Sequence, residues 1–208
     1  TIANLTHLTT LSLFDNQLTE LPPELWQMIT LEDLALRTNH LTHLPDAIGQ
    51  LIHLRSLNLS SNRLSELPAT IGSLTALTEL RLNDNLLTNL PPELFQLTHL
   101  EWLDVSDNQL NTLSPDIANL THLKVFYIRH NQLTDLPPEL WQLNTLEALS
   151  LAENQLTTIP PDIANLTNLC QLNLSQNQLT ELPAELEELE QLNRDNLCRL
   201  NVDENPLE

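Results

Sequence analysis

The feature that most constrains this chain is a set of asparagines spaced at one fixed interval. Nine asparagines define eight intervals, and seven of these are 23 residues long. The last interval is 28, so one unit carries five extra residues. The set comprises Asn16, Asn39, Asn62, Asn85, Asn108, Asn131, Asn154, Asn177 and Asn205. Periods of roughly 20 to 50 residues are typical of proteins that stack one structural unit on the next. We therefore expect a repeat fold.

Each of these asparagines ends one phrase and leads into a second. The first is L-x-x-L-x-L-x-x-N, as in residues 100–108, and the second is x-L-x-x-L-P-x-x-[LI], as in residues 17–25. The alternation in L-x-L predicts a short strand with its leucines inward and the intervening residues outward. An inward asparagine has donors and an acceptor for the backbone groups exposed where the strand turns, and it can also bond the next coil.

The second phrase predicts a short helical turn on the opposite side of each coil. Proline suits the first position of a helix, and the acid that follows it complements the helix dipole. One coil cannot bury its leucines alone, whereas stacked coils share a continuous core. We predict a curved α/β solenoid of about nine coils with a parallel sheet on its concave face and short helices or 3-10 turns on its convex side. Residues 1–208 form one domain, with regular units over 8–191 and an irregular last unit over about 192–208.

This pattern resembles the leucine-rich-repeat family over essentially the whole chain. The 23-residue unit with Leu-Pro in its second half is similar to the intracellular subclass, which includes Ras-linked scaffolds, plant Ras-group repeats, Roco GTPases and many bacterial proteins. The resemblance implies protein–protein recognition through the concave face and its rim. Because the chain starts in the middle of a unit, we expect it to be a fragment of a longer protein.

The composition excludes several classes of function. A net charge of −20 repels the phosphates of nucleic acids and of acidic membrane surfaces. No apolar stretch approaches the roughly 18 residues that a membrane-spanning helix needs. Two glycines are too few for a phosphate-binding loop, and we find no nucleophile–base–acid set. We expect no catalysis, no cofactor, no metal and no small-molecule substrate.

Outward strand positions carry the information for binding, because the inward ones are fixed by the core. Arg, Trp and Tyr gather at these positions in the fourth to sixth units, and interface hot spots are enriched in the same residue types. The candidate partner-binding residues are Arg81, Trp102, Asp104, Tyr127, Arg129 and His130, with Arg37 and Phe14 in the first two units. A structural interpretation is also open, in which Trp102 only covers its neighbours and Arg81 pairs with Asp104 across the strands.

Two further columns of residues have structural explanations. Trp26, Phe95 and Trp141 share one position of the convex turn, where we expect them to seal the core. Histidines recur just before the strand, at His7, His53, His99 and His122. A metal site needs three or four convergent ligands and such a column supplies two, so we expect surface histidines.

Cys170 and Cys198 occupy the same position of successive units, so their backbones come within range of a disulfide. Two cysteines are too few for the disulfide framework of a small secreted domain. The five extra residues before Cys198 also leave its register with Cys170 open, so we favour a reduced pair over a bridge. That choice leads us to expect the cytoplasm, or the host cytosol if the protein is a bacterial effector.

The sequence thus predicts a scaffold that binds a protein partner on its concave face. An alternative is the substrate-targeting module of a multidomain enzyme, such as a GTPase or a bacterial effector, with the catalytic domain elsewhere. A third interpretation, a purely structural spacer, predicts that the concave aromatic residues can be lost without effect.

Overall fold

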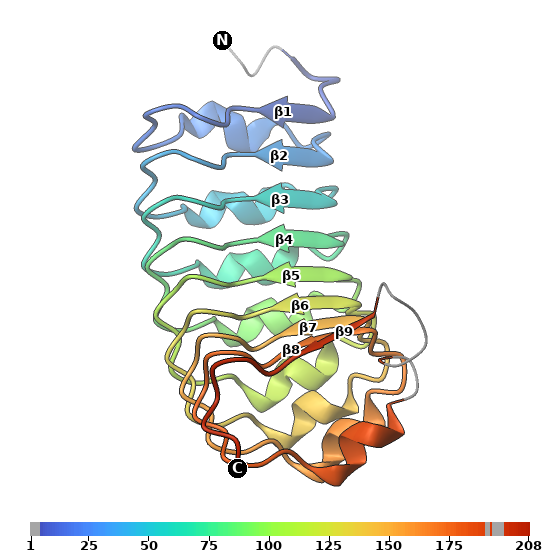
Figure 1. Cartoon of the computed structure of the whole chain (residues 1–208). Coiled ribbons are helices and arrows are strands. Elements are labelled where there is room, and N and C mark those ends of the chain that lie inside the picture. Colours follow the sequence, from blue (N-terminus) through green and yellow to red (C-terminus); the bar gives the residue numbers. More distant parts are fainter. Residues whose placement is uncertain (1–4, 190–191, 193–197) are drawn as a thin grey trace.

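The chain winds into a single stack of coils with all of its strands on one side (Figure 1). The computed structural model describes residues 5–189, 192 and 198–208, and the features below refer to these. Nine strands form one sheet in sequence order, and each pairs in parallel with the next. The strands are Thr10–Ser12 (β1), Asp33–Ala35 (β2), Ser56–Asn58 (β3), Glu79–Arg81 (β4), Trp102–Asp104 (β5), Val125–Tyr127 (β6), Ala148–Ser150 (β7), Gln171–Asn173 (β8) and Arg199–Asn201 (β9). The predicted parallel sheet is confirmed.

The register of the sheet keeps equivalent residues of successive units side by side. Leu57 on β3 pairs with Leu80 on β4, which pairs in turn with Leu103 on β5, and all three are fully buried. The flanking strand residues face the other side and remain partly exposed there. The alternation predicted from L-x-L is therefore present. The five extra residues of the last unit fall within residues 190–197, largely outside the part of the chain that the structure describes.

The convex side consists of one 3-10 helix of five residues per coil. These helices are Pro23–Gln27 (η2), Asp46–Gln50 (η3), Ala69–Ser73 (η4), Pro92–Gln96 (η5), Pro115–Asn119 (η6), Pro138–Gln142 (η7), Pro161–Asn165 (η8) and Ala184–Glu188 (η9). Seven of them have proline as the residue that precedes the first turn; in η6 Ser114 takes that place, and its hydroxyl accepts a hydrogen bond of 3.1 Å from the backbone N–H of Asp116. No helix in the described residues has the length and apolar character needed to span a membrane.

One position on the convex side carries either a very large or a very small residue in each coil from η2 to η8. It is occupied by Trp26, Phe95 and Trp141 in three coils, and all three rings are at most 3% exposed. The coils next to them carry Gly49, Gly72, Ala118 and Ala164 at the same position. A methyl group on Gly72 would lie 2.6 Å from the backbone oxygen of Glu93 in the next coil, so the glycine permits close approach of η4 and η5. The prediction that the aromatic residues seal the core is confirmed.

The recurring asparagines form a ladder through the interior. Asn108 donates to the carbonyl oxygens of Val105 and Ser106 in its own coil at 3.1 and 3.0 Å, and to Leu82 in the preceding coil at 3.0 Å. Its Oδ1 accepts from the backbone N–H of Leu87 in the preceding coil at 2.9 Å. The same set recurs from Asn39 to Asn205. The side chain of each of these asparagines thus bonds the preceding coil rather than the next one, and links the two coils.

Immediately before each ladder asparagine, one residue adopts a left-handed backbone conformation. The φ angles of these nine residues lie between 51° and 59°, and none of them is a glycine. They are Asp15, Thr38, Ser61, Asp84, Asp107, His130, Glu153, Gln176 and Glu204. A non-glycine residue there costs on the order of 1–2 kcal/mol. Hydrogen bonds such as that from Asp107 N to Arg129 O, at 2.9 Å, hold the turn in place and direct these side chains to the rim of the sheet.

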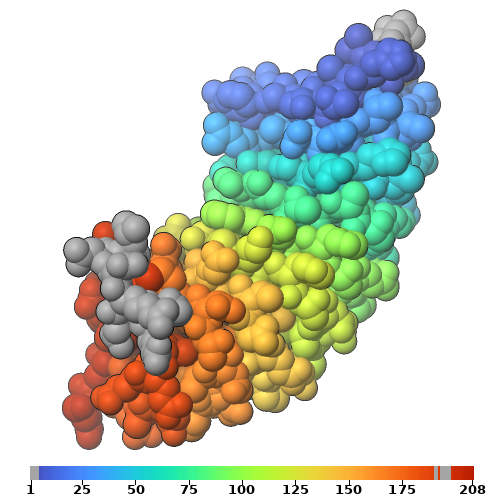
Figure 2. Space-filling view, turned by 90° about the vertical axis from the view of Figure 1, so that its right-hand side faces the viewer, coloured from blue at the N-terminus to red at the C-terminus, as the bar shows by residue number. Residues whose placement is uncertain are grey.

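The coils stack into a continuous arc from one end of the chain to the other (Figure 2). A single hydrophobic core runs along the stack, and leucine is its main component. The inward residues of β2 to β8 are fully buried in this core, whereas Leu11 on β1 is partly buried and Leu200 on β9 is exposed. The outward residues of the strands lie on one shared surface.

We expect the ladder to control stability. The variant Asn108→Ala leaves buried backbone groups of two coils without partners, and unpaired buried groups cost about 1–3 kcal/mol each. The midpoint of urea denaturation should fall, with a loss of about 3 kcal/mol or more. Asn111→Ala is the matched control, because Asn111 is exposed and lies outside the ladder. Equal destabilisation by the two substitutions would contradict the role of the ladder.

Candidate partner-binding surface

Three side chains from adjacent strands form a row on the concave face. They are Arg81, Trp102 and Tyr127, and we call them the aromatic row. The Arg81 guanidinium on β4 lies over the Trp102 ring on β5, with 5.0 Å from Cζ to the ring centroid. The Trp102 and Tyr127 rings meet edge to face with centroids 5.5 Å apart. The indole N–H of Trp102 is covered and has no acceptor among the described residues, so ring contacts rather than a hydrogen bond hold this side chain. The structure therefore brings together the centre of the predicted site.

Asp104 belongs to this surface but does not pair with Arg81. The two residues are register partners, yet the ion pair of Arg81 in the described chain is with Glu79 on its own strand, 2.6 Å from Nε to Oε1. Asp104 accepts a hydrogen bond of 3.0 Å from the backbone N–H of Ser106. The alternative prediction of a cross-strand pair between Arg81 and Asp104 is therefore wrong.

Tyr127 is the last member of the aromatic row, on the side of the C-terminal coils. Its hydroxyl is held in the neutral form. Burial raises the pKa of Tyr127 above its ordinary value of 10.0, and the negative charge of Asp104 on the neighbouring strand raises it further. Its register partner on one side is Asp104, and on the other side it is Ser150. Tyr127 therefore offers a protonated hydroxyl at neutral pH.

Arg129 and His130 form a second cluster at the rim. Arg129 is 3.1 Å from Asp107 and 3.5 Å from Glu153, and His130 Nδ1 is 2.7 Å from Asp107. Exposed ion pairs contribute little to stability, typically below about 1 kcal/mol. These residues lie beside the aromatic row, and both of them already contact carboxylates at the rim.

Phe14 and Arg37 lie apart from the other predicted residues. The Arg37 guanidinium stacks on the Phe14 ring at 4.8 Å from the centroid, and the Phe14 side chain is 48% exposed. They follow β1 and β2, whereas the aromatic row begins at β4. The structure does not bring them to the same place, so they form a separate patch on the concave face.

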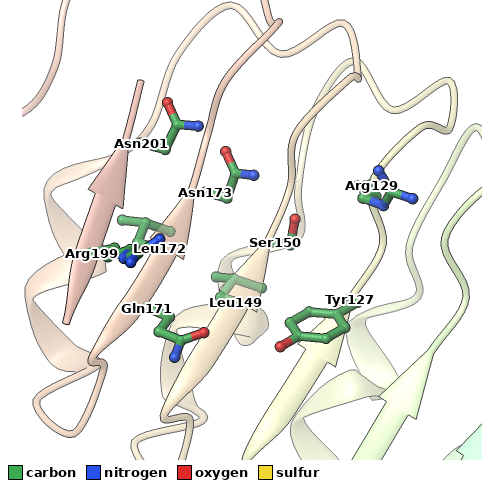
Figure 3. A pocket seen from close by; sticks show the side chains of 9 residues that line it. All are labelled: Tyr127, Arg129, Leu149, Ser150, Gln171, Leu172, Asn173, Arg199 and Asn201. Atoms are coloured by element: carbon green, nitrogen blue, oxygen red, sulfur yellow. The ribbon is translucent and has the colours of Figure 1, made fainter. Parts of the chain in front are cut away.

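Sequence reasoning missed a hollow that lies beyond Tyr127 on the same face (Figure 3). It encloses about 350 Å³, and its lining comprises Tyr127, Arg129, Leu149, Ser150, Gln171, Leu172, Asn173, Arg199 and Asn201. The outward residues along and just after β7 are small, namely Ala148, Ser150 and Ala152, and all three are buried. Short side chains there, between taller ones on β6 and β9, leave the hollow. The run of small outward residues was the signal that could have revealed it.

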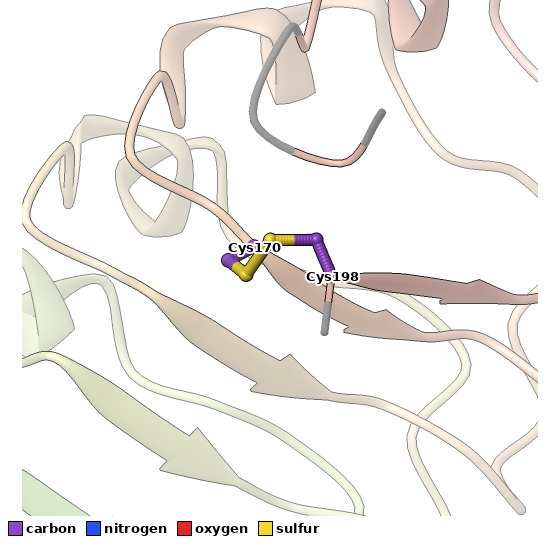
Figure 4. The surroundings of a disulfide bond; sticks show 2 residues. All are labelled: Cys170 and Cys198. Atoms are coloured by element: carbon purple, nitrogen blue, oxygen red, sulfur yellow. A yellow bond between two sulfur atoms is a disulfide. The ribbon is translucent and has the colours of Figure 1, made fainter. Parts of the chain in front are cut away.

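A disulfide joins Cys170 and Cys198 at the start of the last two strands (Figure 4). The two Cα atoms are 4.6 Å apart. The expectation of a reduced pair is therefore wrong. The reason is geometric, since the two residues precede register partners on β8 and β9, so pairing of the strands aligns the thiols despite the five extra residues. The bond also ties β9, which carries Arg199, to the rest of the sheet.

The histidine column and the carboxylates form no metal site in the described residues. His99 and His122 stack with centroids 5.8 Å apart, and His122 Nδ1 bonds the carbonyl of Thr98 at 2.9 Å. The stacking follows from their common place in adjacent coils.

Family comparisons agree with this architecture. Models described as "Leucine rich repeat" match residues 6–64, 121–179 and 144–207, a model of a "Leucine-rich repeat region" matches 46–116, and one of "Leucine Rich repeats (2 copies)" matches 98–141. The chain belongs to the leucine-rich-repeat family. No curated protein matches it significantly.

Solved structures of the same fold come from bacteria and plants. A leucine-rich-repeat protein of Leptospira interrogans is 34% identical, with a TM-score of 0.80 over 100% of this chain and 57% of its own. The ectodomain of the Arabidopsis thaliana receptor kinase GASSHO1/SCHENGEN3, in complex with CASPARIAN STRIP INTEGRITY FACTOR 2, is 33% identical with a TM-score of 0.85, over 99% of this chain and 25% of its own. The functional domain of InlJ from Listeria monocytogenes, which includes a cysteine ladder, is 25% identical with a TM-score of 0.83, over 97% of this chain and 40% of its own. The chain thus spans less than two thirds of each of these proteins.

The environment of Tyr127 can be measured directly, because it is the one tyrosine of the chain. Ultraviolet titration of the folded protein should give a phenolate midpoint above 10.0, the value expected after unfolding in urea. Asp104→Asn should lower the midpoint without restoring the ordinary value, since burial is the larger cause.

The sign of the effect on stability follows from the raised pKa. The contribution of neutral Tyr127 is complete below the unfolded pKa and is lost as the pH rises through the folded pKa. A folded midpoint at or below 10.0 would contradict the burial of this hydroxyl.

Proposed function

We propose that this chain is a protein-interaction module that binds a partner on the concave face, centred on Arg81, Trp102 and Tyr127, and that it performs no chemistry itself. The observation that carries the proposal is the contact of these three side chains across β4, β5 and β6 on the outward side of the sheet. All three are partly exposed. Stacked aromatic and guanidinium groups offer a rigid apolar surface that a partner can cover at low entropic cost.

The chemistry of the surface supports a protein partner. Trp, Tyr and Arg are the residue types most enriched among interface hot spots, where truncation of one side chain costs about 2 kcal/mol or more. Lys124, Arg81 and Arg129 place positive charge among the carboxylates of β4 to β6 and their flanks. A mixed surface of this kind suits a partner of mixed or negative charge despite the net charge of the chain.

The structural neighbours support the same kind of activity. Leucine-rich-repeat folds are typically interaction modules, and the Arabidopsis thaliana ectodomain was solved in complex with the factor named above. The concave surface would also serve the alternative role, in which it selects the substrate of an attached enzyme.

We also propose that the protein works in an oxidising compartment rather than the cytoplasm. The cytoplasmic expectation depended on reduced cysteines, whereas Cys170 and Cys198 are bonded to each other. Disulfides persist in oxidising environments and are rare in cytosolic proteins.

The compartment can be tested in the source cells. Protein trapped with acid and then alkylated with a maleimide of high mass should show no adduct before reduction and two adducts after it. Two adducts before reduction would contradict the proposal and indicate a reducing compartment. The variant Cys170→Ser, which leaves one thiol, calibrates the shift of a single adduct.

The binding surface can be tested by comparing wild type with the variant Trp102→Ala/Tyr127→Ala/Arg129→Ala in capture from an extract of the source organism. We expect the recovery of the partners that the wild type captures to fall at least tenfold with the variant, because the variant lacks the rings of Trp102 and Tyr127. Circular dichroism and urea denaturation verify that the variant folds.

The matched control is Ile29→Ala/Ile52→Ala/Arg63→Ala. Ile29 and Ile52 are 55% and 51% exposed, and all three residues lie outside the strands. This control should keep every partner. Retention of all partners by the concave variant would overturn the proposal and favour the structural spacer.

A further inference from the structure

We propose that the hollow beside Tyr127 receives an acidic side chain, aspartate or glutamate, of an extended segment of the protein partner. The inference deepens the proposed function and rests on it, since the hollow belongs to the same concave face. It identifies both the place where the partner is anchored and the chemistry that anchors it.

The charge of the lining is the first argument. The chain has 28 carboxylate residues and 8 basic ones. The lining nevertheless contains no carboxylate and two arginines, Arg129 and Arg199. The two come from opposite sides, Arg129 beyond the end of β6 and Arg199 on β9 (Figure 3). Their separation by the hollow leaves room for an anion between them.

The two arginines differ in how far they are already neutralised. Arg129 contacts both Asp107 and Glu153. Arg199 is exposed and forms no ion pair with any described residue. The nearest carboxylates after it in the sequence, Asp203 and Glu204, lie beyond the end of β9. Arg199 is therefore the group with most to gain from an added carboxylate.

The orientation of the side-chain amides of Asn173 and Asn201, which both line the hollow, is the second argument. Asn173 Oδ1 accepts from the backbone N–H of Ser175 at 3.1 Å and from its hydroxyl at 2.8 Å. Asn201 Oδ1 accepts from the backbone N–H of Asp203 at 2.9 Å. A backbone N–H can only donate, so both amide oxygens are committed. The two Nδ2 groups are left as donors, and no described residue accepts from them. With the guanidinium groups, the hollow offers an excess of donors, which suits a carboxylate.

The shape suits one side chain and its adjoining backbone. Ligand pockets generally enclose roughly 300–1,000 Å³, so about 350 Å³ is small for a cofactor. Leu149 and Leu172 lie beneath the hollow and are each 1% exposed, so contacts with a bound residue come from the other lining side chains.

The position of the hollow favours a peptide segment over a free small anion. Tyr127 lines the hollow and also contacts Trp102, so the hollow continues directly into the aromatic row. A segment lying across the strands would cover the rings and place its carboxylate between the arginines. The disulfide next to Arg199 fixes β9 against β8, so this wall of the hollow is held before binding.

The test is selection of a displayed library of random 12-residue peptides on the immobilised full chain, followed by synthesis of the best binder. We expect one position of the selected peptides to be enriched in Asp or Glu. Its replacement by the corresponding amide should weaken binding about tenfold or more, as should Arg199→Gln in the protein, because charge-assisted hydrogen bonds are lost. The control Arg63→Gln makes the same charge change on an exposed residue outside the strands and should leave affinity within twofold.

A second pair of variants keeps the test independent of Arg199. Asn173→Asp retains the oxygen that caps the turn, as Asp104 does at the same position of β5, but replaces the donor with an acceptor. We expect it to weaken the acidic peptide at least tenfold. Asn58→Asp makes the same exchange on β3, where Asn58 caps the same turn far from the hollow, and should have little effect.

The outcomes separate this inference from the proposed function. Lack of acidic enrichment, or equal effects within the Arg199/Arg63 and Asn173/Asn58 pairs, overturns the acidic anchor. If binding then still falls with Trp102→Ala, the proposed function stands without it. If no concave variant alters binding, both fail.

Discussion

The hydrogen bonds of the ladder asparagines are the interaction on which the rest of this structure depends. Each coil turns directly after a strand of three residues, which leaves backbone donors and acceptors inside the stack. Asn108 and its equivalents satisfy these groups in two coils at once. Buried polar groups without partners are costly, so the asparagine position tolerates little variation, and the interval between asparagines sets the register of the whole sheet.

That register converts a linear repeat into columns of neighbouring side chains. Residues 23 apart become partners across strands, as in the ion pair of Lys124 with Glu101 at 2.8 Å. Positions that face outward are free of the demands of the core. Their chemistry can therefore change from coil to coil, and this chain uses the freedom unevenly. Aromatic and cationic residues occupy the centre, while small residues on β7 open a hollow next to them.

Much of the fold could be predicted from the sequence because one strong rule generates it. The strands, the convex turns, the ladder and the buried aromatic column all follow from the spacing of leucine, asparagine and proline. The candidate site was predictable as a list of neighbours, and the contacts of Trp102 with Arg81 and Tyr127 agree with that list.

The remainder depended on the actual positions of side chains. Arg81 forms its ion pair with Glu79 rather than with Asp104, and the repeat pattern does not indicate which of the two carboxylates is the partner. The hollow arises because the outward side chains of β7 are small. The amide orientation of Asn173 depends on the turn after β8. The disulfide was missed because the extra residues made the register before Cys198 ambiguous, and pairing of β8 with β9 resolved it.

The convex position that carries Gly or Ala in some coils and Trp or Phe in others has a consequence for shape. Spacing on the concave side is set by strand pairing, whereas spacing on the convex side depends on side-chain bulk. Close approach of η4 and η5 is possible because Gly72 has no side chain, and a bulkier residue would force the helices apart. The curvature of a solenoid follows from the small rotation between units. The breadth of the surface offered to a partner is therefore tuned from the opposite side of the molecule, by residues that the partner never touches.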